Sequence, residues 1–287
     1  MSIQIENVSM QFKGTRALDD VSLQIGEGIF GLLGENGAGK TTLMRILCTL
    51  LKPTEGAVSV YGRQIRKENI EEIKRWVGYL PQELGLYPSL TVRESLDYIG
   101  GLCGMSKGRR RERIDLLLEM TNLTEHQKKK NRQLSGGMKR RVGLVQAMLH
   151  SPRLLIVDEP TAGLDPEERI RIRNLLVDFA QGRTVLFSTH VVEDLSATSH
   201  ELCMLNKGKV RYIGTIDEML RKAEGHVYQC ALKKEQEILE MRKNYFVTGN
   251  VYSGTEIQVR FLSEEEPEIP CARAAATLED AYIYLNH

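Results

Sequence analysis

The stretch from residue 29 to residue 47 constrains the fold more than any other part of the chain. An apolar run that predicts a strand, residues 29–33, leads into a glycine-rich loop, and residues 42–47 then predict a helix. The loop matches the pattern G-x-x-x-x-G-K-[ST] at every fixed position. Small residues let successive N–H groups point inward and form a site for an anion. The sequence therefore predicts a nucleotide site on an α/β core, with Lys40 on the terminal phosphates and the Thr41 hydroxyl on Mg²⁺.

A second apolar run, residues 154–157, ends in two consecutive acids, Asp158 and Glu159. Such a run is typical of a buried parallel strand. Asp158, at the carboxyl end of the strand, is expected to hold Mg²⁺. Glu159 is the candidate general base that polarises the attacking water. Because Pro160 follows the two acids directly, a purely structural role for both is the weaker interpretation.

A second turn of phosphate-binding type precedes the acids at Leu134-Ser135-Gly136-Gly137. A serine and two glycines at the start of a helix offer free N–H groups and the positive end of the helix dipole to an anion. The chain already has a complete phosphate loop. This second turn therefore raises the question of which phosphate it holds.

Taken in order, these motifs resemble those of the ATP-binding subunits of ABC transporters over nearly all of residues 1–218. Phe12 lies 28 positions before Lys40, as the adenine-stacking aromatic residue of that family does. Gln82 resembles the family's glutamine loop. Asp165 ends a segment similar to the D-loop, and His190 follows an apolar strand as the switch histidine does.

The resemblance implies a set of site residues. The catalytic residues would be Glu159, His190, Gln82 and Lys40, and the ligands of Mg²⁺ would be Thr41, Gln82 and Asp158. The residues expected to bind ATP are Phe12, Gly34, Glu35, Asn36, Gly37, Ala38, Gly39, Lys40, Thr41, Thr42, Ser135, Gly136, Gly137 and Asp165.

Four of these residues also have plainer interpretations. Phe12 fits a core position on an edge strand, and Gln82 alone would be a solvated loop residue. Asp165 fits the cap of a helix that begins near Pro166. His190, just past a buried strand, fits a capping or core residue.

The predicted fold is a P-loop NTPase core of the α/β class, with an antiparallel β subdomain and a helical subdomain. The ATPase domain is expected at 1–218, with the helical subdomain at about 84–150, where apolar residues recur at helical spacing. Residues 219–287 are expected to form a small C-terminal α/β appendage, with strands at 226–232, 245–247 and 257–261. In the amino-terminal part, strands are expected at 21–25, 57–61 and 76–80.

The implied function is ATP hydrolysis coupled to transport through a separate membrane permease. In the family, two subunits pack head to tail, and Ser135 with the N–H groups of Gly136 and Gly137 covers ATP held by the other chain. The second cassette of the pair would be either an identical chain or a related chain with a different sequence. Met138 and the C-terminal Thr-Leu-Glu-Asp-Ala stretch at 277–281 resemble two-component exporters, which favours export. The expected location is cytoplasmic, peripheral to the inner face of the cell membrane.

Composition agrees with this interpretation. The net charge of +1 gives no reason to expect nucleic-acid binding, and the basic clusters at 107–113 and 128–132 read as solvated faces. The five cysteines show no metal spacing and suggest reduced thiols, and no apolar run approaches 18 residues. The alternative function is a soluble ABC ATPase acting on a ribosome or a DNA-repair complex. Against it, the chain has one motif set and no long coiled coil between Gln82 and Leu134.

Overall fold

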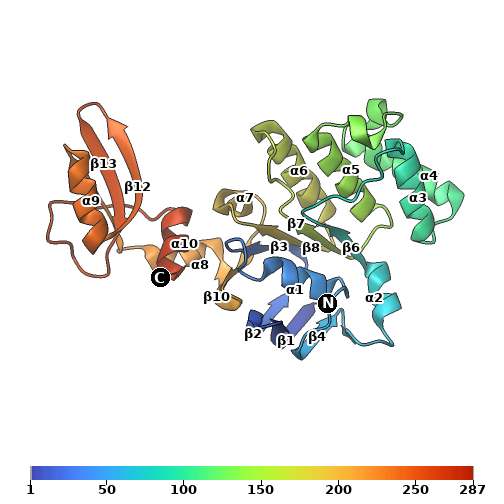
Figure 1. Ribbon diagram of the computed structural model, residues 1–287, viewed down its shortest axis with the longest axis horizontal. Coiled ribbons are helices and arrows are strands. Elements are labelled where there is room, and N and C mark those ends of the chain that lie inside the picture. Colours follow the sequence, from blue (N-terminus) through green and yellow to red (C-terminus); the bar gives the residue numbers. More distant parts are fainter. Residues whose placement is uncertain (1, 287) are drawn as a thin grey trace. The chain divides into compact units, whose positions relative to one another are not determined.

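The computed structural model describes residues 2–286, which divide into two compact units between Val210 and Arg211. Each unit has a hydrophobic core of its own. The predicted α/β class, with an antiparallel sheet beside a mainly parallel one, is confirmed (Figure 1).

The first unit is built on a six-stranded sheet with the order β10-β9-β3-β8-β7-β6, whose edge strand β10 begins at the end of this unit and continues into the second. The pairs β9–β3, β3–β8, β8–β7 and β7–β6 are all parallel. In such sheets ligand sites gather at the carboxyl ends of the strands. The strands are β3 (Gly28–Leu33), β6 (Val77–Leu80), β7 (Leu154–Asp158), β8 (Thr184–Thr189), β9 (Glu201–Asn206) and β10 (Lys209–Thr215).

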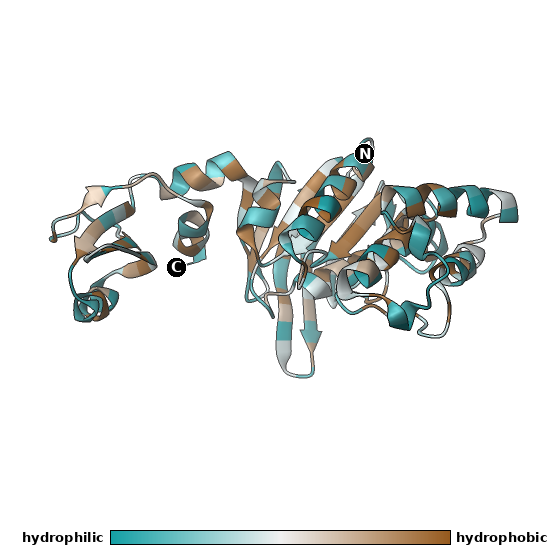
Figure 2. Cartoon of the chain, turned by 90° about the horizontal axis from the view of Figure 1, so that it is seen from above, coloured by the Kyte–Doolittle hydropathy of each residue, from teal (hydrophilic) through white to brown (hydrophobic). Residues whose placement is uncertain are grey.

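Every residue of β7 and β8 is buried, as the unbroken apolar run at 154–157 predicts for an interior parallel strand. Figure 2 shows the strands of this sheet in the colours of hydrophobic residues. Along the chain, helices lie between successive strands. They are α1 (Lys40–Leu47), α2 (Ile70–Trp76), α6 (Pro166–Phe179) and α7 (Val192–Ser196).

The antiparallel sheet has the order β2-β1-β4-β5. Its strands are β1 (Ile3–Phe12), β2 (Thr15–Ile25), β4 (Glu55–Val60) and β5 (Arg63–Gln64). Two predicted strand ends were wrong. Tyr61 leaves β4 in a turn with φ of 49°, and Trp76 ends α2 instead of starting β6. The two rings meet edge to face at 6.1 Å.

The segment between 84 and 150 is helical. It contains α3 (Val92–Leu102), α4 (Lys107–Met120) and α5 (Gly136–Met148), together with two short 3₁₀ turns. The three helices pack on one another, and α5 also packs on β6. A buried face explains the predicted spacing, because Val92, Leu96, Ile114, Leu117 and Leu118 are all at most 1% exposed.

The second unit is an antiparallel sheet with the order β12-β13-β11-β14 and three helices. All three strands predicted there are present, and β12 extends beyond its predicted end. The elements are α8 (Ile216–Ala223), β11 (Val227–Leu232), α9 (Glu235–Asn244), β12 (Phe246–Ser253), β13 (Glu256–Leu262), β14 (Ala272–Arg273) and α10 (Leu278–Asn286). Among residues 2–286, no helix has the length and apolar character needed to cross a membrane.

The C-terminal Thr-Leu-Glu-Asp-Ala stretch anchors α10 to the sheet of the second unit. Asp280 is 1% exposed and accepts hydrogen bonds from the Thr277 N–H at 2.8 Å, the Thr248 hydroxyl at 2.6 Å and Arg260 Nε at 2.7 Å. Burial raises the pKa of Asp280, but the hydrogen bonds from Arg260, Thr248 and Thr277 together hold it below its usual value. The stretch therefore has a clear structural role within its own unit.

Replacing Asp280 with Asn should destabilise the second unit by about 3 kcal/mol, since it leaves the largely buried Arg260 without its counter-charge. In the wild type the carboxylate's contribution is fully present above the unfolded-state pKa of about 4. It is lost as the pH falls through the lower folded-state pKa. Amide hydrogen exchange over β11 and β13 measures the change. The exposed Glu240→Gln in α9 is the control, and equal protection in both variants would contradict the prediction.

Candidate functional site

The predicted phosphate loop joins β3 to α1 and lines a pocket of about 480 Å³. Gly39 caps α1 with φ of 107°, and a Cβ atom there would lie 2.6 Å from the Ala17 carbonyl oxygen. Glycine is thus required for the turn that aims the helix N-terminus into the pocket. Ten predicted site residues line the pocket: Phe12, Glu35, Asn36, Gly37, Gly39, Lys40, Thr41, Thr42, Gln82 and Glu159.

Lys40 provides a buried positive charge at the centre of the loop. Its ammonium donates to the carbonyl oxygens of Gly34 and Glu35, and it lies 3.9 Å from a carboxylate oxygen of Glu159. Burial lowers the pKa of Lys40, and the carboxylates of Glu159, Asp158 and Glu35 oppose that shift. A buried ammonium among loop carbonyls suits a polyphosphate, whose negative charge would offset the cost of burial.

Asp158 links three adjacent parts of the site. One carboxylate oxygen accepts a hydrogen bond from the Thr41 hydroxyl at 2.9 Å, and the other accepts from the Ser188 hydroxyl at 2.7 Å. The carboxylate is thereby held at the carboxyl ends of β7 and β8, beside the start of α1.

These residues fit a magnesium ion. A hydroxyl, a carboxylate and the amide oxygen of Gln82 supply only oxygen ligands, which Mg²⁺ prefers. Residues 2–286 contain no cluster of three or more His, Cys, Asp or Glu side chains that could hold a metal. Mg²⁺ usually takes one or two carboxylates and completes its shell with water and substrate phosphates.

Glu159 meets two other predicted catalytic residues. One of its carboxylate oxygens lies 2.9 Å from His190 Nδ1, and the other accepts from Gln82 Nε2 at 3.2 Å. Its backbone is left-handed, with φ of 47°, and its N–H donates to the Ser188 hydroxyl at 3.1 Å. A non-glycine residue with positive φ costs on the order of 1–3 kcal/mol and persists only where its surroundings fix it. The carboxylate of Glu159 is thus held in place by backbone as well as side-chain contacts.

The structure also bears on the plainer interpretations of Phe12, Gln82, His190 and Asp165. Phe12 is 42% exposed at the end of β1, so it is not a core residue. His190 is not a core residue, because its side chain is 47% exposed. Gln82 is an exposed loop residue, but its side chain donates a hydrogen bond to the Glu159 carboxylate. Asp165 does cap α6, because its carboxylate accepts from the Glu168 N–H at 2.9 Å.

The second phosphate-binding turn, Leu134-Ser135-Gly136-Gly137, is called the signature turn below, and it is not part of this pocket. Ser135 caps α5 by accepting from the Met138 N–H at 3.3 Å, and Ser135 and Gly136 are exposed. No residue of 134–137 lines the pocket of the phosphate loop. Among the described residues, a single chain therefore does not bring its two phosphate-binding turns together.

Two residues of the site were missed by the sequence motifs. Ser188 bonds Asp158 and the backbone of Glu159, and Arg140 is a buried arginine on α5. One feature of the sequence could have indicated that Arg140 is buried: its charge precedes the apolar run Val142–Val145, on a helix expected to pack against the core. Its acceptors come from backbone carbonyls, which no residue pattern reveals.

Comparison with known proteins places this site in a family. A family model described as ABC transporter matches residues 18–162. The uncharacterized ABC transporter ATP-binding protein YxlF of Bacillus subtilis is 34% identical over 87% of this chain and 83% of its own length. The methionine import ATP-binding protein MetN of Halalkalibacterium halodurans is 33% identical over 93% and 82%. The linearmycin resistance ATP-binding protein LnrL of Bacillus subtilis is 35% identical over 78% and 72%.

Solved structures agree. The dimeric structure of MJ0796, a bacterial ABC transporter cassette, has a TM-score of 0.69 at 29% identity and covers 74% of this chain and 98% of the cassette. A post-hydrolysis state of the same cassette, bound to ADP and Pi, has a TM-score of 0.66 at 27% identity. The chain therefore belongs to the ABC transporter family as an ATP-binding cassette, and its enzyme class is that of an ATPase.

Proposed function

We propose that this chain hydrolyses ATP only as half of a head-to-tail pair, in which each ATP lies between one chain's phosphate loop and the other's signature turn. The observation that carries the proposal is the separation of the two turns. The pocket holds Lys40, Gln82 and Glu159, whereas Ser135 and Gly136 lie exposed at the start of α5, where the first N–H groups of a helix have no partner within the helix. A second copy of the chain would supply the missing donors, as the dimeric cassette among the relatives suggests.

In this proposal each residue acts on the γ-phosphate or on the attacking water. Lys40 and the loop N–H groups hold the phosphates, and the face of Phe12 stacks on the adenine. Glu159 accepts a proton from the water, and His190 donates a hydrogen bond to the γ-phosphate. Phosphoryl transfer depends mainly on positioning and electrostatics. Donors supplied by the second chain could therefore contribute on the order of 10²–10³-fold in rate.

Thr41, Asp158 and Gln82 would hold Mg²⁺, which neutralises charge on the phosphates when bound. The protein's own contribution is to fix their oxygens. The Thr41–Asp158 hydrogen bond already brings the hydroxyl and the carboxylate within 2.9 Å of each other.

We propose further that the pair drives export through a separate membrane permease at the inner face of the cell membrane. Support comes from Met138, from the C-terminal stretch and from a 38% identical relative of Paraburkholderia xenovorans that is named Nod factor export ATP-binding protein I, although MetN is named for import. Extraction of membranes with the chain bound, followed by identification of the copurifying integral protein, tests this part. Recovery of the chain free of any membrane protein would contradict it.

The paired site makes hydrolysis depend on protein concentration. The rate per chain should rise at least ~10-fold between nanomolar and micromolar protein, because dilution separates the pair and leaves each ATP half covered. Chelation of Mg²⁺ should bring the rate to background at every concentration. Steady-state phosphate release with saturating ATP measures both effects. A rate per chain that does not change on dilution would count against the shared site.

A further inference from the structure

Arg140 is a buried side chain of the first unit that makes five hydrogen bonds, and no motif assigns it a role. It lies on α5, five residues after Ser135, and is 6% exposed. Its guanidinium has five N–H groups, and each has a backbone carbonyl acceptor. The acceptors are the carbonyl oxygens of Pro81, Gln82, Asp158, Glu159 and Pro160.

These five carbonyls belong to two separate parts of the catalytic site. Two come from the glutamine loop, with Nη1 donating to Pro81 at 3.1 Å and to Gln82 at 2.7 Å. The other three follow one another at the end of β7, and among them Nε donates to Pro160 at 3.2 Å. One rigid planar group therefore ties the backbones of Gln82 and Glu159 to the helix that starts at the signature turn.

The charge of this group is retained against its burial. Burial lowers the pKa of Arg140, and the carboxylates of Asp158 and Glu159 oppose the shift. A lysine could not replace it, because one ammonium nitrogen cannot reach acceptors spread around a planar fork. The requirement is for a fork with several donors, which goes beyond a need for positive charge.

We propose that Arg140 is a positioning residue that transmits the nucleotide state of the chain's own site to its signature turn. Nucleotide on the phosphate loop engages the side chains of Gln82 and Glu159, and any backbone shift that follows is passed through Arg140 to α5. Because the proposed function places that turn over the partner's ATP, Arg140 would couple the two sites of the pair. The proposal rests on that function.

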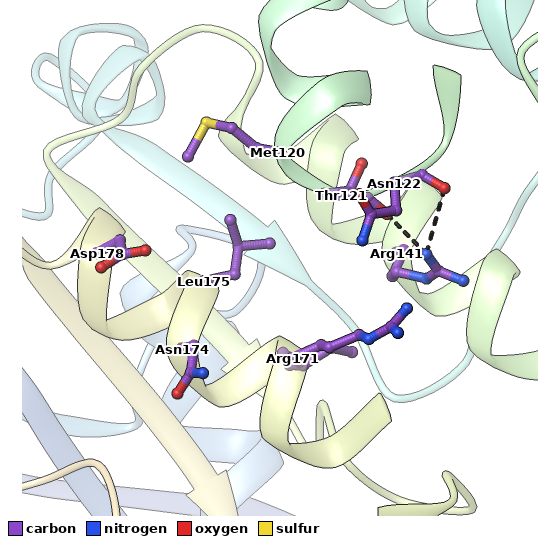
Figure 3. A pocket seen from close by; sticks show the side chains of 9 residues that line it. Met120, Thr121, Asn122, Arg141, Arg171, Asn174, Leu175 and Asp178 are labelled. Carbon is purple, nitrogen blue, oxygen red and sulfur yellow. Dashed lines mark hydrogen bonds between the residues drawn. The ribbon is translucent and has the colours of Figure 1, made fainter. Parts of the chain in front are cut away.

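Arg141 is a matched control on the same helix. It is 9% exposed, but it faces elsewhere: it donates to the Thr121 carbonyl at 2.7 Å and pairs with Glu168 at 3.1 Å. Figure 3 shows Arg141 with its hydrogen bonds to Thr121 and Asn122, beside a pocket of about 310 Å³ between α4 and α6. Loss of Arg141 removes a buried arginine without touching the glutamine loop or the acids.

The test is amide hydrogen exchange at residues 135–139 in the full chain, diluted until sedimentation shows a monomer. Exchange is compared with and without a non-hydrolysable ATP analogue and Mg²⁺. In the wild type and in Arg141→Lys, the analogue should change the exchange rates at least ~3-fold. In Arg140→Lys and Arg140→Gln the change should fall below about 1.5-fold, measured at an analogue concentration that saturates each variant.

Two results would overturn the inference: no change at 135–139 in a wild-type monomer that binds the analogue, or an undiminished change in the Arg140 variants. If both variants fail to fold, the wild-type arm can still overturn the inference, because unchanged exchange at 135–139 on binding of the analogue leaves nothing for Arg140 to transmit. Failure of the proposed function is distinguishable, because it would appear as a wild-type rate per chain that is independent of concentration.

Discussion

Glu159→Gln should bind ATP as tightly as the wild type and hydrolyse it at least ~10²-fold more slowly. The amide cannot accept the proton of the attacking water. The phosphate cradle should survive, because Lys40 is held mainly by the carbonyl oxygens of Gly34 and Glu35. The backbone of residue 159 is fixed through Ser188, whose contacts do not involve the side chain that is changed.

Because bound ATP is no longer consumed, this variant should accumulate as an ATP-bound dimer. Phosphate release gives the rate, and size exclusion with millimolar ATP gives the oligomeric state. The control is Glu83→Gln, which neutralises an exposed carboxylate next to Gln82 and should keep the wild-type rate. A Glu159→Gln chain that remains monomeric with ATP would contradict the shared site.

The second large effect concerns two inactive chains that restore each other. Ser135→Arg should abolish hydrolysis, since a long side chain on the first turn of α5 would project into the partner's nucleotide site. Lys40→Ala should abolish it by removing the buried charge at the centre of the loop. Each variant alone is expected to fall at least ~10²-fold below the wild type.

An equal mixture should recover at most about a quarter of the wild-type rate, because half of randomly paired dimers are mixed and each has one intact site. Phosphate release from the mixture, set against the sum of the separate rates, measures the recovery. Ser106→Arg is the control, because Ser106 is likewise the exposed N-cap of a neighbouring helix, α4, and this variant should stay active. A mixture no faster than its parts would contradict the pairing of one chain's phosphate loop with the other chain's signature turn.

The local parts of the site were predictable because they depend on short stretches of chain. The loop at 34–41 and the acids that end β7 are each fixed by a turn or a strand end, and the carboxyl ends of parallel strands meet at one edge. Hence the contact between Thr41 and Asp158, 117 positions apart, follows from topology. The resemblance in motif order supplied Phe12, Gln82 and His190, which single residue patterns left open.

Other features depend on packing. The sequence pattern placed Trp76 in the strand that follows, whereas in the structure it ends α2 and its ring meets that of Tyr61 edge to face. The stretch that contains Asp280 was interpreted only as a resemblance to exporters. In the structure, Asp280 accepts hydrogen bonds from three separate segments of its unit. Neither contact leaves a periodic signal.

By itself, the sequence determined the family, the phosphate loop, the acidic strand end and the existence of a second phosphate turn. Only the tertiary structure decided that this second turn faces solvent while Lys40, Gln82, Glu159 and His190 converge without it. Only the structure, too, placed Arg140 among five carbonyls. The physical reason is that main-chain carbonyls are the same at every residue, so which of them a buried guanidinium meets is set by folding and not by composition.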